Sequence, residues 1–430
     1  MRPITRASLL HALTLLRKLR ARTTLPALLA GLAAALAAVV GWTLLPTQDA
    51  TASRDDRPRF KVDASWPKAL PNSWLVGQVA GVAVDRHDHI WIIQRSSTLT
   101  DDEAGAEARF PLNPAVPATR TAPRSNCCKG APAVMKFNRQ GDLLAAWGGQ
   151  SDPGFLTNRC TAAMGCQWPT NEHGIYVDHN DYVYIGGNGA PNNQLLKFTK
   201  DGTFVYQISV AGAFSGGRSN DTKGDPNGRP LLGQPADSEV DPDTNELYIA
   251  DGYQNRRVLV VDAATGTYKR HWGAYGQNPV NDTPTPAYDP NAPISTQFRN
   301  PVHCVRIADD GLVYVCDRVN NRYQVFTKSG HFITEVFLER DTLGNGAMWD
   351  LDVSPDRHQR FLYNADGENQ NVVIFNRRTG DVLGKFGRNG RSAGQFHWVH
   401  NLAVDSKGSI YTAEVDTGKR AQRFVRVDDD

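Results

Sequence analysis

The sequence lacks several features that mark common protein classes. Its six cysteines include no Cys-x-x-Cys pair, so the motifs of zinc ribbons, thioredoxins and c-type haem attachment are absent. Net charge is also small, because 47 Lys and Arg nearly balance 45 Asp and Glu. Six of the basic residues and one acid lie in residues 1–52, which leaves 41 basic and 44 acidic residues in the remainder. This mildly acidic body lacks the basic face that nucleic acids require, so we expect no nucleic-acid partner.

The N-terminal segment has no charged residue between Thr23 and Thr47, and a basic stretch precedes it. A small-x-small site, Ala50-Thr51-Ala52, follows. We therefore predict that residues 1–52 are a secretory signal peptide or, since the apolar stretch nearly suffices to span a bilayer, a retained signal-anchor. Both alternatives place the body outside the cytosol, periplasmic or secreted, with membrane contact only through this segment if it stays uncleaved. Residues 53–57 are predicted to be a linker.

The cysteines fit an extracytoplasmic location, where disulfides form. Cys304 and Cys316 stand symmetrically about the turn Ala308-Asp-Asp-Gly311, so they would face each other across a hairpin, and we predict a disulfide between them. The remaining four are expected to pair Cys127 and Cys128 with Cys160 and Cys166. Spacing alone does not fix that connectivity.

One pattern recurs six times in the body: a short β-rich run, a polar turn, and a second β-rich run. The copies begin at Gly81, Gly174, Asp237, Cys304, Asp350 and Asn401. Most are followed by a third run and then, after a Gly turn, a fourth. Four short strands at a period of about 40–50 residues are typical of propeller blades. We predict an all-β, six-bladed β-propeller over residues 58–430, in which Arg59–Asp63 supplies the last blade's missing strand and closes the ring.

Histidine occupies one position of this repeat in alternate copies. Five positions before the end of the first strand stand, in order, Ala80, His173, Ala236, His303, Trp349 and His400. First strands line the central channel of a propeller, and alternate blades of six are related by about 120°. The three imidazoles should therefore converge on the axis, where three His ligands with an open position form a catalytic-type zinc site. Zinc suits this ligand set better than copper or nickel.

Further candidate residues should surround these histidines. Loops that leave the second strands lie on the same face of a propeller as loops that enter the first strands. This places Arg95, Tyr253 and Arg318 at the mouth of the central channel, beside the histidines. An arginine fork beside a metal suits a carboxylate, and a tyrosine there can act as a base. The seven other histidines are expected to be surface or structural residues: His87, His89, His179, His271, His331, His358 and His397.

These residues, in their order along the chain, resemble peptidyl-α-hydroxyglycine α-amidating lyase (peptidylamidoglycolate lyase), a six-bladed NHL-type propeller. The likeness extends from about Val79 to Phe424 and includes Pro301-Val-His303, Asp251-Gly-Tyr253 and Asp317-Arg318. The resemblance implies that His173, His303 and His400 bind zinc and that Tyr253 is the base. It also implies that Arg95 and Arg318 hold the substrate and its carboxylate. The implied reaction cleaves the C–N bond of a C-terminal α-hydroxyglycine and gives an amide and glyoxylate.

One departure concerns a second metal. The family has an Asp directly after the third histidine that helps to hold a structural Ca²⁺, and Asn401 stands there in this sequence. An amide oxygen can coordinate Ca²⁺ but lacks the charge, so calcium is doubtful.

Two other functions fit the sequence beside an extracytoplasmic zinc-dependent lyase. One is a non-catalytic NHL propeller that serves as a binding scaffold, and the other is a different metal-dependent propeller hydrolase. The expected partner is a small carboxylate-bearing substrate or a peptide C-terminus, and we expect a monomer.

Overall fold

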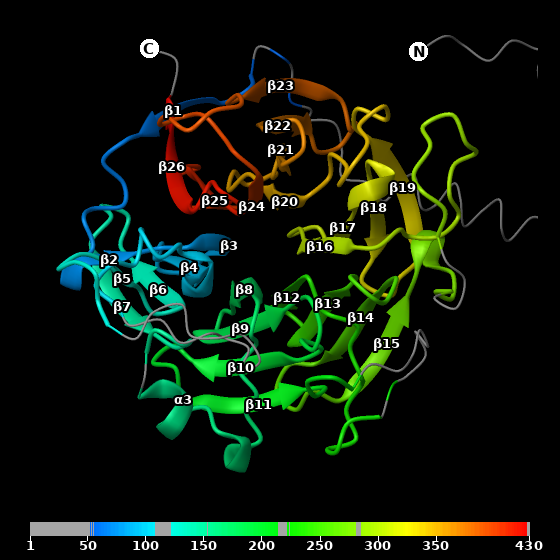
Figure 1. Cartoon of the computed structure of the whole chain (residues 1–430). Coiled ribbons are helices and arrows are strands. Elements are labelled where there is room, and N and C mark those ends of the chain that lie inside the picture. Colours follow the sequence, from blue (N-terminus) through cyan, green and yellow to red (C-terminus); the bar gives the residue numbers. More distant parts are fainter. Residues whose placement is uncertain are drawn as a thin grey trace, which may run out of the picture. The chain divides into compact units, whose positions relative to one another are not determined.

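The computed structural model describes residues 52, 54, 56–107, 122–152, 154–213, 222, 224–280 and 285–427. These residues form six four-stranded sheets, which Figure 1 shows arranged around a common centre. Each innermost strand contacts the innermost strands of both neighbouring sheets. The predicted all-β, six-bladed propeller is therefore confirmed.

The first three blades follow the chain from the inside outwards. Blade 1 consists of β3 (Gln78–Val84), β4 (Ile90–Arg95), β6 (Val134–Phe137) and β7 (Leu143–Trp147). Blade 2 consists of β8 (Glu172–Val177), β9 (Tyr182–Gly187), β10 (Leu195–Thr199) and β11 (Phe204–Ile208). Blade 3 consists of β12 (Asp237–Asp241), β13 (Glu246–Asp251), β14 (Arg257–Asp262) and β15 (Tyr268–Trp272).

The last three blades repeat this order, except that the outer strand of blade 6 comes from the start of the body. Blade 4 consists of β16 (Val302–Ile307), β17 (Leu312–Asp317), β18 (Arg322–Thr327) and β19 (Phe332–Phe337). Blade 5 consists of β20 (Asp350–Val353), β21 (Phe361–Asp366), β22 (Asn371–Asn376) and β23 (Val382–Phe386). Blade 6 consists of β24 (Val399–Val404), β25 (Ile410–Glu414), β26 (Arg420–Val427) and β1 (Arg59–Asp63).

A few short elements lie outside the blades. They are the parallel pair β2 (Trp74–Leu75) and β5 (Lys129–Gly130), the helix α3 (Phe155–Asn158), and 3-10 helices at Pro71–Ser73, Ser96–Thr98, Ala162–Met164, Ala274–Gly276 and Arg318–Asn320.

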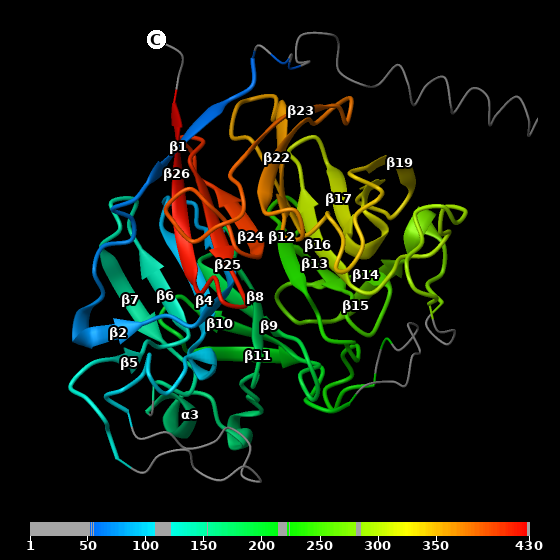
Figure 2. The ribbon, with the colours of Figure 1, turned by 45° about the horizontal axis from the view of Figure 1, so that its top comes forward.

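The ring closes through the pairing of β1 with β26, as predicted. The two strands are antiparallel, with Arg59 opposite Val427 and Asp63 opposite Arg423, and they lie side by side in Figures 1 and 2. This pairing gives blade 6 its fourth strand and joins the two ends of the repeat.

The core lies between adjacent sheets rather than at one centre. One cluster of buried side chains combines Trp91 of blade 1 with Val183 and Phe198 of blade 2, and each further interface has a similar cluster. Middle strands are covered on both faces, so every residue of β4 and β21 is buried. This two-sided burial explains the apolar runs Ile90–Ile93 and Phe361–Tyr363 with which these strands begin.

Three disulfides join all six cysteines. Cys304 and Cys316 are bonded across the β16–β17 hairpin, as predicted. The expected pairing of Cys127 and Cys128 with Cys160 and Cys166 is wrong, because Cys127 bonds Cys128 and Cys160 bonds Cys166. The short turn between Cys160 and Cys166 brings their Cα atoms to 5.0 Å, which is the usual spacing for a bridge. Three disulfides are typical of an extracytoplasmic, oxidising environment.

The predicted signal or anchor in residues 1–52 lies almost entirely outside the described residues. Within the described part of the chain, no helix has the length and apolar character needed to cross a bilayer.

Candidate active site

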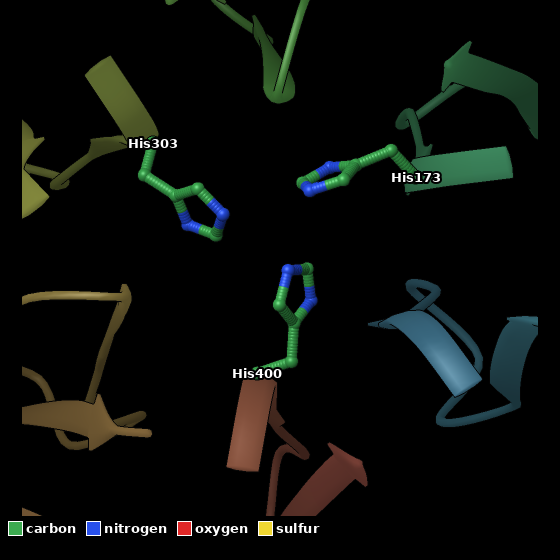
Figure 3. Close-up of side chains that lie close together, drawn as sticks. All are labelled: His173, His303 and His400. Atoms are coloured by element: carbon green, nitrogen blue, oxygen red, sulfur yellow. The ribbon is translucent and has the colours of Figure 1, made fainter. Parts of the chain in front are cut away.

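The three histidines of the alternating column meet at the centre of the ring. His173 lies on β8, His303 on β16 and His400 on β24, and Figure 3 shows their imidazole rings pointing toward one another. One potential ligand atom from each ring lies within 4.8 Å of the other two. All three residues are at least 96% buried. The sequence therefore predicted the convergence correctly.

The strand pairing is irregular at each of the three histidines. The pairing of β8 with β9 shifts register between Glu172 and Ile175, and β16 and β24 shift in the same way around their histidines. A β-bulge re-aims side chains that strict alternation would send to one face or the other. The same shift occurs in β3 around Ala80, whereas in β12 and β20, the innermost strands of blades 3 and 5, the pairing continues without a shift.

Each histidine is oriented by a backbone carbonyl of the next blade. The Nδ1 atoms of His173, His303 and His400 lie 2.7, 2.5 and 2.7 Å from the carbonyl oxygens of Ala236, Trp349 and Ala80. A carbonyl oxygen only accepts hydrogen bonds, so each Nδ1 carries the proton and donates it. In a neutral ring the lone pair is then on Nε2, as in many metal-binding histidines.

Burial keeps these rings neutral. It lowers the pKa of His400 to about 3, with Arg95 and Arg318 acting in the same direction. Burial and the neighbouring positive charges also hold the pKa values of His173 and His303 well below the usual range. Three neutral imidazoles whose Nδ1 protons are donated to carbonyl oxygens could hold a metal ion through their Nε2 atoms.

Tyr253 lies at the same centre. Its hydroxyl oxygen is 2.8 Å from Nε2 of His173 and 3.1 Å from Nε2 of His303. The turn that carries it packs tightly, since a Cβ atom on Gly252 would lie 1.9 Å from the carbonyl oxygen of Val302. Glycine therefore allows the Tyr253 turn to approach the strand that carries His303.

Arg318 follows β17 and lies beside Tyr253. Its guanidinium is centred 4.5 Å from the ring centroid of Trp349, and its two hydrogen bonds, to Tyr253 Oη and Asn345 Oδ1, are long at 3.5 and 3.4 Å. The Nε atom has no partner. Only 7% of the residue is exposed, and among the described residues no carboxylate forms an ion pair with it. A buried guanidinium of this kind suits an external anion.

Arg95 is also buried near the histidines, and each of its three nitrogens donates to a protein acceptor. Nε donates to the carbonyl oxygen of Glu172 at 2.5 Å, Nη1 to Gln78 at 2.9 Å and Nη2 to Asn188 at 3.2 Å. The structure therefore brings Arg95 close to the site, with its guanidinium held by protein acceptors.

Sequence reasoning did not identify several residues at this site. They are Gln78, Asn188, Asn345 and Trp349, which hold the two arginines. Trp349 occupies the histidine column in blade 5, and this position could have indicated that it lies at the centre of the ring. The three amides lie in or beside loops, where the repeat gives no register.

No family model matches the chain. Peptidyl-glycine alpha-amidating monooxygenase B of Xenopus laevis is 28% identical over 191 residues, which cover 42% of this chain and 19% of the relative. The A form of the same organism is 27% identical over 191 residues, with 42% and 18% covered.

The chain is similar in sequence to peptidyl-glycine alpha-amidating monooxygenases. The resemblance to an α-amidating family that the residues indicated is thereby confirmed. The match spans less than a fifth of the length of these relatives.

Among solved structures, a streptogramin B lyase superposes with a TM-score of 0.47 at 10% identity, covering 86% of this chain and 98% of that one. A protein of unknown function from Bacteroides thetaiotaomicron gives a TM-score of 0.48 at 13% identity, covering 86% and 77%.

Proposed function

We propose that this protein is an extracytoplasmic, zinc-dependent lyase that cleaves the C–N bond of an α-hydroxyglycine-type substrate. The products would be an amide and glyoxylate. The similarity to α-amidating monooxygenases supports this reaction class, but it covers only part of the chain, so the proposal depends mainly on the site.

The observation that carries the proposal is the burial of Arg318 beside Tyr253 with few hydrogen-bond partners. A buried guanidinium with an unpartnered Nε lies within 3.5 Å of a tyrosine hydroxyl that itself contacts two converging histidines. A substrate with a hydroxyl group one carbon away from a carboxylate matches this arrangement, because the carboxylate can pair with Arg318 while the hydroxyl reaches the histidine centre.

His173, His303 and His400 would hold the zinc ion through Nε2. When bound, zinc would supply Lewis acidity to an oxygen of the substrate. Arg318 would hold the carboxylate through its free donors, and Trp349 would keep the guanidinium in place. Arg95, whose three nitrogens each donate to the protein, would act through its positive charge and through the loop that its bonds fix.

Tyr253 would carry the proton. Cleavage breaks the C–N bond, turns the hydroxyl carbon into the aldehyde carbon of glyoxylate and leaves the electron pair on nitrogen. The hydroxyl oxygen loses a proton and the amide nitrogen gains one, so the reaction balances without an oxidant or reductant. Tyr253 would act as the phenolate, whose Oη is placed to accept that proton at the hydroxyl oxygen.

The test measures glyoxylate release from an N-acyl-α-hydroxyglycine by the zinc-loaded full chain. We expect turnover well above the rate of the enzyme-free reaction. Tyr253→Phe should keep zinc and lose at least about 100-fold in kcat, the lower range for general acid–base catalysis. His331→Ala, a change at an exposed histidine, is the matched control and should leave turnover unchanged.

Other outcomes separate the remaining functions. A protein that binds zinc but releases no glyoxylate would favour a different metal-dependent hydrolase over this lyase. A protein that binds no metal would support the binding scaffold. Unchanged turnover in Tyr253→Phe would remove this residue from the mechanism.

A further inference from the structure

A second cluster of charged residues lies further along the innermost strands, beyond the histidines. In the repeat, the next position after the histidine column holds Asp237, Asp350 and Asn401 in blades 3, 5 and 6. Three positions after the column come Glu239, Arg306 and Asp352 in blades 3, 4 and 5. Equivalent positions of the innermost strands lie at similar depth in the ring, so these residues form a layer beside the histidine site.

Arg306 joins the blades on either side of its own. Its Nη1 lies 2.8 Å from Asp237 Oδ2 in blade 3, and its Nη2 lies 3.3 Å from Asp350 Oδ1 in blade 5. Glu239 Oε2 lies 3.8 Å from Nη1. The side chain of Arg306 is 12% exposed and that of Asp350 is 1% exposed. The guanidinium is therefore the central cation of a largely buried carboxylate cluster.

The carboxylates also bond the backbone of neighbouring blades. Asp237 accepts from the N–H of Val305 at 3.3 Å, and Asp350 accepts from the N–H of Leu402 at 2.9 Å. The N–H of Val404 donates to Asp352 at 2.8 Å. Blades 3, 4, 5 and 6 are thus linked through groups that surround one guanidinium.

Asn401 belongs to this network and does not present a free ligand. Its Nδ2 donates to Asp350 Oδ2, and its Oδ1 accepts from the N–H of Val82 at 2.6 Å. The resemblance places a calcium ligand at this position, where Ca²⁺ needs several oxygen atoms directed at it. Here the amide N–H₂ points to the nearest carboxylate, and that carboxylate already faces a guanidinium. The residues present do not fit a calcium ion.

We propose that Arg306 supplies from within the chain the positive charge that a structural calcium would supply, so that this propeller needs no calcium. Four acidic side chains, Asp237, Glu239, Asp350 and Asp352, interact with this one cation. A buried carboxylate cluster needs a cation to offset its repulsion and lost hydration. The guanidinium meets that need by hydrogen bonds to two blades, and it cannot dissociate.

The experiment uses the full chain, stripped of metal, reloaded with zinc and then heated with or without millimolar Ca²⁺. The wild type should show the same unfolding midpoint in both conditions and should carry no calcium after dialysis. Arg306→Met removes the cation but keeps much of the side-chain length. We expect its midpoint to fall by more than about 5 °C, and Ca²⁺ should restore part of that loss by binding the carboxylates that no longer face a guanidinium.

Two further variants make the result decisive. Arg306→Lys keeps the charge and should remain indifferent to Ca²⁺. Arg86→Met removes an exposed arginine that pairs with Asp181 at 3.2 Å and should change neither the midpoint nor the calcium response. A wild-type midpoint that rises with Ca²⁺, bound calcium in the wild type, or a folded Arg306→Met variant that ignores Ca²⁺ would each overturn the proposal. If Arg306→Met does not fold, the wild type and Arg306→Lys decide the question by their calcium response.

Discussion

The imidazole of His303 donates its Nδ1 proton to the backbone carbonyl of Trp349 at 2.5 Å, and the two residues occupy the same position of consecutive blades. His173 and Ala236, and His400 and Ala80, repeat this relationship around the ring. Blades that lack a histidine therefore supply the carbonyl oxygens that orient the histidines of the others. Each imidazole is thus oriented by a backbone acceptor from the next blade, an outer contact that fixes which ring nitrogen faces the centre.

Removing one histidine should abolish zinc binding. His303→Ala leaves two neutral imidazoles, which is fewer than the three protein ligands of a catalytic zinc site. We expect zinc content to fall from about one ion per chain to near zero, as measured by elemental analysis after dialysis. His331→Ala should retain the wild-type content. Full zinc occupancy in His303→Ala would show that the ion, if present, binds elsewhere.

Trp349 should affect substrate binding without affecting zinc. Its backbone carbonyl orients His303 whatever the side chain, whereas its indole ring holds the guanidinium of Arg318 at 4.5 Å. Trp349→Phe weakens that contact, which is worth about 0.5–2 kcal/mol. We expect KM for the carboxylate substrate to rise, by at most roughly 30-fold, with unchanged zinc content. A change in zinc content with unchanged KM would contradict this division of roles.

The sequence predicted the propeller because each blade carries a local pattern, namely four short β-rich runs separated by Gly, Asp or Asn turns. It also predicted the histidine column and the Cys304–Cys316 bridge, since both depend on positions counted within one blade. Contacts between blades were not predictable in this way. The hydrogen bond of His400 to Ala80 spans 320 residues. The register shifts at the three histidines have no recognisable sequence pattern.

The repeat also places charged residues at inward positions of the innermost strands, and the metal site was predicted from the histidine column alone. Glu239, Arg306 and Asp352 stand at one repeat position in three consecutive blades, on strands that line the channel. Opposite charges at such positions indicate a buried ion-pair cluster. Which of these residues pair could not be predicted, because the long side chain of Arg306 contacts Asp237 and Asp350, which stand at another position of the repeat.

Gly252 should be essential for the position of Tyr253. A methyl group there would lie 1.9 Å from the carbonyl oxygen of Val302 and 2.4 Å from its nitrogen, and backbone atoms of a central strand cannot give way by that amount. We expect Gly252→Ala to lower the unfolding midpoint and to reduce kcat, because the turn must move away from His303. Gly154→Ala is the control, since its nearest neighbour would lie 3.9 Å away. A fully active and stable Gly252→Ala variant would show that the turn is not fixed by this contact.

Glu239 should make the protein less stable as the pH rises. Burial is the main cause that raises its pKa to about 8, with the charges of Asp352 and Asp237 acting in the same direction and that of Arg306 against it. Tyr176 is the other titratable group that faces this carboxyl. Between the unfolded value of 4.5 and about 8, the folded state binds more protons than the unfolded state. The free energy of unfolding must therefore fall as pH rises through this window, by at most about 1.4 kcal/mol per pH unit.

Glu239→Gln removes this dependence while it keeps an oxygen that can accept from the N–H of Ile307, now 3.2 Å from the carboxylate. At pH 5 the variant and the wild type should have similar unfolding midpoints, because Glu239 is neutral in the folded protein. Toward pH 9 the variant should become the more stable of the two. Asp243→Asn, a change at a carboxylate whose side chain is 81% exposed, should give no such gain. Parallel pH profiles for Glu239→Gln and the wild type would show that Glu239 is ionised throughout this range and that Arg306 alone balances its charge.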